Sequence, residues 1–82
     1  MSMTLFDAAI LNFLFNEGYT TKLHAAKIQD ISLEATANAL YKRINSLCKE
    51  SYIAKGLAEG HAHTYYLTTK GIEFYKENLD NE

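Results

Sequence analysis

The sequence predicts an α+β domain that is mostly helical, with a three-helix core, a β-hairpin and a C-terminal helix. Three successive patterns predict this order. Apolar residues recur at helical spacing as far as residue 50, alternate with polar ones between 52 and 68, and return to helical spacing over 69–79. A chain of 82 residues suffices for one modest core, so we expect a single domain over residues 1–82.

The composition narrows the class of protein. A hydrophobic fraction of 48% and an aromatic fraction of 12% are typical of a folded globule. No apolar run reaches the roughly 18–20 residues of a membrane span and no signal peptide begins the chain, so we expect a cytoplasmic protein with no membrane partner. The single cysteine, Cys48, excludes an internal disulfide. We expect no metal, no cofactor and no enzyme activity, because phosphate loops, ligand sets and activated nucleophiles are missing from the sequence.

The first predicted helix covers about residues 4–16. Its apolar stripe consists of Leu5, Phe6, Ala9, Ile10, Phe13 and Leu14. Gly18 stands where a left-handed residue would end the helix. Leu11 and Phe15 project on the opposite side, where a lone small domain should show polar residues. Together with Phe74, which points away from the apolar stripe of the last helix, they predict the interface of a homodimer.

Two further helices are predicted over about 21–28 and 33–50. Thr20 or Thr21 can cap the shorter helix, and Ser32 can cap the longer one, whose polar face is basic. A tight turn joins the two. Two helices joined this closely, with the second longer and more basic, form a helix-turn-helix pattern, in which the second helix reads the major groove of DNA.

The order of elements is that of a winged helix-turn-helix, with the wing over about 52–68 and the last helix over about 69–79. Alternation along the wing places Tyr65 and Leu67 close enough to the core to be buried, and Thr68 can cap the last helix. The motif that begins with Leu40-Tyr41 is similar to the recognition helix of PadR-like transcription regulators. The residues that carry this likeness are Leu40, Tyr41, Ile44, Leu47, Tyr52 and Ile53. The later stretch HTYYLTTKG resembles the end of the wing, Tyr-x-Leu-Thr-x-x-Gly, that PadR-like and MarR-like families share.

The resemblance implies a DNA-binding transcription regulator, a repressor that acts as a homodimer on double-stranded DNA. Ser51 stands where the family usually has glycine at the turn into the wing. The chain also ends soon after the last helix, without the long dimerisation domain of full-length PadR-like regulators. We therefore expect a minimal form, for which a small-molecule effector is not expected.

The candidate DNA contacts fall into two sets, because base edges give sequence preference and phosphates give salt-dependent affinity. The predicted base contacts lie on the polar face of helix 33–50 and comprise Asn38, Tyr41, Lys42 and Asn45. Tyr41 lies at the edge of the apolar stripe, so core packing is an equal alternative for it. The predicted backbone contacts are Thr20, Thr21, Lys22, Arg43, Lys49, Lys55, His61 and His63.

Two other interpretations remain open at this point. The formal net charge is −2, which speaks against a nucleic-acid binder, although residues 20–70 carry seven basic and four acidic groups. A winged helix that binds protein instead of DNA would suit the acidic total and the apolar residues expected at the surface. A metal or pH site at His61 and His63 has the right same-face spacing, with only Glu59 or His24 available as a third ligand.

Overall fold

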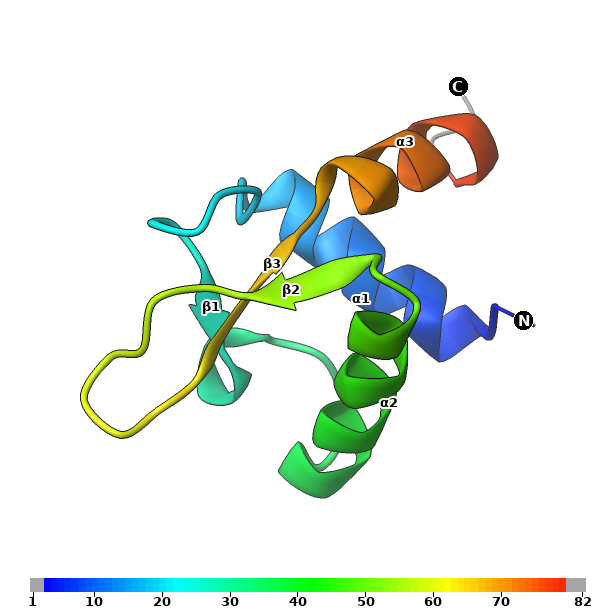
Figure 1. The fold of residues 1–82 in the computed structure, drawn as a ribbon. Coiled ribbons are helices and arrows are strands. Elements are labelled where there is room, and N and C mark those ends of the chain that lie inside the picture. Colours follow the sequence, from blue (N-terminus) through cyan, green and yellow to red (C-terminus); the bar gives the residue numbers. More distant parts are fainter. Residues whose placement is uncertain (1–2, 80–82) are drawn as a thin grey trace.

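The computed structural model describes residues 3–79, and its elements follow the predicted order except between residues 21 and 30 (Figure 1). They are α1 (Leu5–Asn16), β1 (Ala26–Lys27), the 3-10 helix η1 (Ile28–Asp30), α2 (Ala37–Lys49), β2 (Ile53–Lys55), β3 (Thr64–Leu67) and α3 (Thr69–Asn78). The predicted fold class is confirmed: three α-helices pack with a small antiparallel sheet. The sequence did not reveal β1, which adds a third strand to the predicted hairpin.

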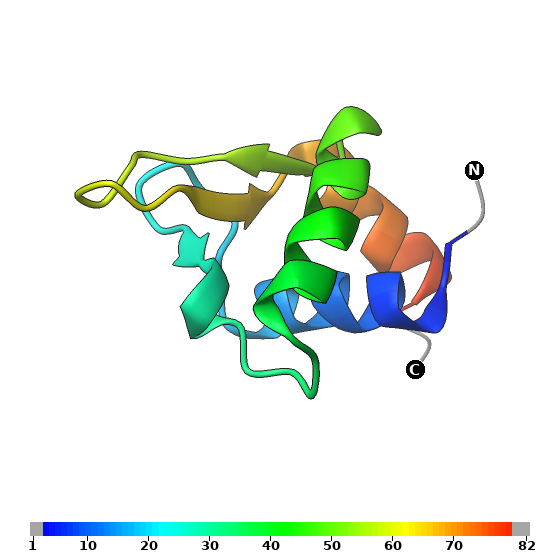
Figure 2. The ribbon, with the colours of Figure 1, turned by 90° about the horizontal axis from the view of Figure 1, so that it is seen from below.

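The first helix, α1, lies at the centre of the molecule. Thr4 caps it, since its hydroxyl accepts a hydrogen bond from the Asp7 N–H and the Asp7 carboxylate accepts one from the Thr4 N–H. Gly18 ends the helix at φ +77°, as predicted, and the Tyr19 N–H bonds back to the Leu14 carbonyl. The helix packs against α2, α3 and β3, so it is covered on several sides (Figures 1 and 2).

This central position corrects the prediction for Leu11, which is 0% exposed and belongs to the core. A helix that is apolar all round is a buried helix, and the second apolar face of α1 is covered within the same chain. The core also contains residues of α2, the sheet and α3. Its fully or almost fully buried apolar members are Ile10, Leu11, Leu14, Ala26, Ile31, Leu40, Ile44, Leu47, Ile53, Tyr65, Leu67 and Tyr75.

The prediction of a helix over 21–28 is wrong. Residues 20–25 form an irregular loop, Ala26 and Lys27 form β1, and only residues 28–30 complete a helical turn. The strand order is β1-β3-β2, and β1 pairs with β3 through Ala26 opposite Tyr65. A short helix carries a high nucleation cost, whereas pairing with β3 supplies ladder hydrogen bonds and buries Ala26 completely.

The second helix, α2, begins four residues later than the predicted Leu33. Thr36, not Ser32, is its cap, because the Thr36 hydroxyl accepts the hydrogen bond of the Ala39 N–H at 3.1 Å. Residues 31–36 form the turn that joins η1 to α2, and Leu33 packs against the core from within this turn. The start of α2 therefore has no acidic residue, and Glu34 is an exposed residue of the turn.

The turn from α2 into β2 repeats the geometry that ends α1. Ser51 takes a positive φ of 68°, and the Tyr52 N–H bonds back to the Leu47 carbonyl. Ser51 thus adopts the left-handed conformation that a glycine would adopt at this place. The chain therefore turns into β2 as it would with glycine. The Thr68 side chain ties the turn to the start of α3, since its hydroxyl donates to the Ser51 carbonyl at 2.6 Å.

Candidate nucleic-acid interface

The polar face of α2 is open to solvent. Asn38, Tyr41 and Lys42 are exposed and Asn45 is half-buried, while Leu40, Ile44 and Leu47 anchor the opposite face in the core. The helix has 13 residues, so it is about 20 Å long, and its exposed amide, phenol and amine groups can reach along several base pairs. Tyr41 is 47% exposed, so the structure places its ring at the surface and not in the core.

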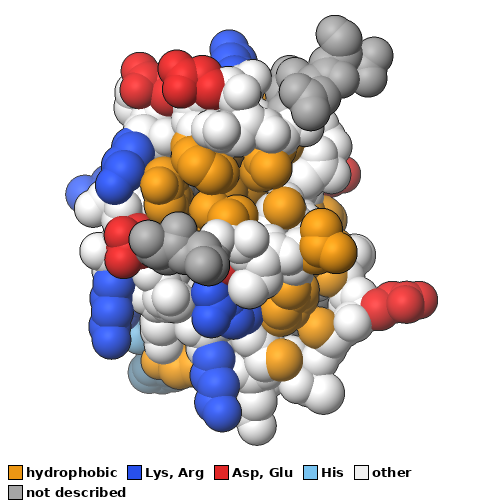
Figure 3. Space-filling model, turned by 90° about the vertical axis from the view of Figure 1, so that its right-hand side faces the viewer, with side chains coloured by type: hydrophobic (Ala, Val, Ile, Leu, Met, Phe, Trp, Pro, Cys, Tyr) orange, Lys and Arg blue, Asp and Glu red, His pale blue; other side chains and the backbone are white. Residues whose placement is uncertain are grey.

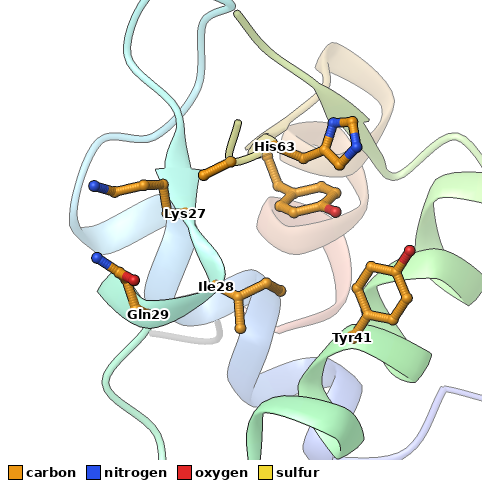
Figure 4. A pocket seen from close by; sticks show the side chains of 7 residues that line it. Lys27, Ile28, Gln29, Tyr41 and His63 are labelled. Carbon is orange, nitrogen blue, oxygen red and sulfur yellow. The ribbon is translucent and has the colours of Figure 1, made fainter. Parts of the chain in front are cut away.

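The hairpin of β2 and β3 projects beside α2, away from the body of the helices (Figure 2). A cavity of about 220 Å³ lies between the two and is lined by Lys27, Ile28, Gln29, Tyr41, Ala62, His63 and Tyr65. Tyr41, Ile28 and His63 approach this space from three different elements, whereas the Lys27 amine and the Gln29 amide point away from it (Figure 4). We call this cavity the notch.

Charged groups at the edge of the notch are paired with each other. The Lys27 amine lies 2.8 Å from the Glu59 carboxylate in the loop of the hairpin, and this contact raises the pKa of Lys27. Burial raises the pKa of the Tyr65 hydroxyl, with a smaller contribution from Tyr41. Tyr65 therefore stays protonated at neutral pH and can donate a hydrogen bond.

Arg43, predicted as a backbone contact, is engaged elsewhere. Its Nε and terminal nitrogen donate to the two oxygens of Asp7 at 2.8 and 2.7 Å, in a fork-to-fork ion pair that joins α2 to the start of α1. Asp7 is 0% exposed, and its carboxylate would be costly to bury without this partner. Burial alone raises the pKa of Asp7, but the hydrogen bonds and charge of Arg43 and the Thr4 N–H together hold it below its ordinary value.

Among solved structures, the chain is similar to TubR from Bacillus megaterium pBM400, with a TM-score of 0.86. Sequence identity is 26%, over 98% of this chain and 90% of that chain. The fold is a winged helix-turn-helix. In a winged helix-turn-helix, the helix at the position of α2 is called the recognition helix, and the hairpin at the position of β2–β3 is called the wing. No protein-family model matches the chain, and no curated protein matches it in sequence.

The structure divides the remaining predicted backbone contacts into two groups. Lys49 and Lys55 are exposed near the end of the recognition helix and on the wing, and His61 and His63 are exposed in the wing loop. Thr20, Thr21 and Lys22 lie in the irregular loop before β1, where the expected helix N-terminus does not exist. These residues therefore offer no exposed helix N–H groups that could hold a phosphate, although Lys22 itself is exposed.

The other two residues predicted for the dimer interface are partly used within the chain. Phe15 stacks on Tyr75 with ring centroids 4.5 Å apart, and Phe74 packs against Tyr52 at 5.0 Å. Both phenylalanines are half-buried. Hydrophobic side chains nevertheless gather on the end of the molecule shown in Figure 3, between acidic and basic groups. Leu5, at the start of α1, is 91% exposed.

Sequence reasoning missed two parts of this region. It did not pair Asp7 with Arg43, although Arg43 is spaced three residues after Leu40 and four before Leu47 and so borders the apolar stripe. It placed Tyr65 in the core but did not see that β1 and η1 would bring Ile28 beside it. Within residues 3–79, no group of three or more His, Cys, Asp or Glu side chains could hold a metal ion. No helix in this range is long and apolar enough to cross a membrane.

Proposed function

We propose that the chain is a sequence-specific transcription regulator that binds double-stranded DNA as a homodimer in the cytoplasm, as a repressor. The observation that carries this proposal is the exposed polar face of the recognition helix beside a projecting wing, on a fold similar to that of TubR. Membership of the PadR-like group and the lack of a small-molecule effector are finer parts of the same proposal.

The recognition helix would lie in the major groove, which is wide enough to admit one α-helix. Asn38 suits a bidentate contact with adenine and Lys42 suits guanine O6 and N7. Both side chains are exposed, and neither makes a hydrogen bond or ion pair within the described residues. Tyr41 and Asn45 extend the same face.

Few cations support DNA binding in one subunit. Arg43 is neutralised by Asp7 and Lys27 by Glu59, so Lys42, Lys49 and Lys55 are the free cations on the recognition helix and wing. The salt dependence of affinity rises with the number of phosphates neutralised, so one subunit should bind weakly. Two subunits related by a two-fold axis would double the contacts and present recognition helices about 34 Å apart.

The structure weakens the protein-binding alternative. That interpretation depended on Leu11, Phe15 and Phe74 at the surface, but Leu11 is buried and both phenylalanines pack against tyrosines of the same chain. The negative net charge of the chain also matters less at the candidate DNA-binding face, because Asp7 is buried and Glu59 is paired with Lys27. The exposed face that remains on α2 is polar, as a DNA contact requires.

Fluorescence anisotropy with a library of duplexes tests the DNA-binding proposal. Lys42→Ala should weaken binding by about 1–3 kcal/mol and relax preference at one base pair. Lys76→Ala on α3 is a matched control, because Lys76 is exposed outside the recognition helix and wing. Equal loss at every position would exclude a base contact for Lys42. Wild-type protein that fails to bind any duplex at low salt would refute the function.

Light scattering tests the homodimer. The wild-type chain should have twice the mass of one 9.3 kDa subunit. Leu5→Glu should shift the mass toward the monomer if the exposed start of α1 belongs to the interface. Leu23→Glu is the control, because Leu23 is 84% exposed but lies beyond the other end of α1. A wild-type monomer at high protein concentration would contradict the dimer.

A further inference from the structure

Tyr65 carries a polar group that the fold itself does not use. The residue is 1% exposed, yet its hydroxyl makes no hydrogen bond within residues 3–79. No side-chain nitrogen or oxygen enclosed within this range lacks a partner, so the hydroxyl is not sealed in the core. Because Tyr65 lines the notch, we infer that its hydroxyl faces that space. A buried tyrosine normally satisfies its hydroxyl, so the missing partner is informative.

The other polar groups at the notch have the same chemical character. Tyr41 presents a phenol from the recognition helix and His63 an imidazole from the wing, and the two approach the same space (Figure 4). Each can donate a hydrogen bond, as can Tyr65. The rest of the wall consists of the apolar Ile28 and Ala62, together with Lys27 and Gln29, whose polar ends point away from the notch (Figure 4). The notch is therefore built for a group that accepts several hydrogen bonds and carries a small apolar part.

The position of the notch indicates which group this is. When a helix occupies the major groove and a wing reaches the adjacent minor groove, the strand between the two grooves must pass between helix and wing. That strand is a ridge of phosphates and deoxyriboses. A phosphodiester oxygen accepts hydrogen bonds from hydroxyl and imidazole groups, and the deoxyribose presents apolar carbon atoms.

We propose that the notch is a seat for one sugar–phosphate unit of the DNA backbone, held by the Tyr65, Tyr41 and His63 donors. The inference rests on the proposed DNA-binding function and adds to it a contact that uses neutral groups. An unpaired Glu59 would repel a phosphate, but its carboxylate forms an ion pair with the Lys27 amine at 2.8 Å, which offsets its charge. With a volume of about 220 Å³, the notch admits one such unit and not a whole nucleobase pair.

Tyr65→Phe tests the seat, because it removes one oxygen and leaves the ring in the core. Anisotropy titration with a random duplex at low salt should show about tenfold weaker binding, since a hydrogen bond to a charged group is lost. The slope of log affinity against log salt should not change, because no cation is removed. Tyr66→Phe is the matched control: the next residue of β3 points to the other face of the sheet and should bind as wild type.

Tyr41→Phe provides a second variant that leaves the core intact, since Tyr41 is 47% exposed. It should also weaken binding several-fold at an unchanged salt slope. If wild type binds DNA while Tyr65→Phe and Tyr41→Phe both bind within twofold of it, the seat is refuted and the DNA-binding function stands. Equal losses in Tyr66→Phe and Tyr65→Phe would also refute the seat. If wild type binds no duplex, both the function and the seat fail.

Discussion

Asp7→Asn should destabilise the protein strongly, although it only replaces one carboxylate oxygen with an amide group. The variant removes the negative charge that faces Arg43 and weakens the acceptor for the Thr4 N–H. Removing one partner of a buried pair commonly costs about 3–5 kcal/mol. The Arg43 side chain is 34% exposed, so its remaining charge still reaches water, and we expect about 2–3 kcal/mol.

The loss should be visible as a lower melting temperature. For a domain of this size about 1 kcal/mol corresponds to roughly 4–8 °C, so the expected loss should lower the melting temperature of Asp7→Asn by roughly 8–24 °C at neutral pH. Circular dichroism followed during heating measures this. Glu73→Gln is the matched control, because Glu73 is an exposed acid on α3 and should shift the midpoint by only about 1–2 °C.

The pH dependence separates the ion pair from a simple packing effect. The pKa of Asp7 in the folded state lies below its ordinary value of 3.8, so its contribution is present above this value and is lost as the pH falls through the lower pKa. The difference between wild type and Asp7→Asn should therefore narrow in acid. A difference of less than about 3 °C at neutral pH would refute the assigned magnitude. A difference that stayed constant into strong acid would refute the role of the charge.

Three further changes test the turn, the helix contact and the edge of the notch. Ser51→Gly should stabilise the protein by about 0.5–1 kcal/mol in urea melts, because a serine at φ 68° is strained; a loss of stability would contradict this. Gly71→Ala should destabilise it by about 2–3 kcal/mol in the same assay, because a Cβ there would overlap the Tyr52 carbonyl, and a neutral result would show that α3 can shift. Glu59→Gln should tighten DNA binding at low salt by about two- to fivefold and steepen the salt slope, because Lys27 is released; unchanged anisotropy curves would exclude this.

Local sequence signals predicted those helix ends that are set by residues within a few positions of the end. Gly18 and Thr68 were recognised as a helix end and a helix cap because each acts on backbone groups within a few residues. The alternation before Thr68 likewise placed Tyr65 and Leu67 in the core, where both are at most 1% exposed. The polar face of α2 followed from the same helical periodicity.

Predictions failed where a distant segment outweighed a local preference. The stretch that looks like a short helix before residue 28 joins β3 instead, because Ala26 gains a strand partner 39 positions away in the chain, at Tyr65. Leu11 appeared to face solvent because the helices that cover α1 could not be placed from the sequence. Arg43 appeared to be a free cation because Asp7 lies 36 residues earlier.

The sequence by itself determined the first and last helices, the hairpin, and the apolar and polar faces of the recognition helix, since these depend on periodicity within one element. The tertiary structure decided which charges remain free and what lies between the recognition helix and the wing. Ion pairs such as Asp7 with Arg43, and a notch walled by Ile28, Tyr41 and Tyr65, join residues from separate elements. Their distances depend on how those elements pack, and no local pattern encodes that packing.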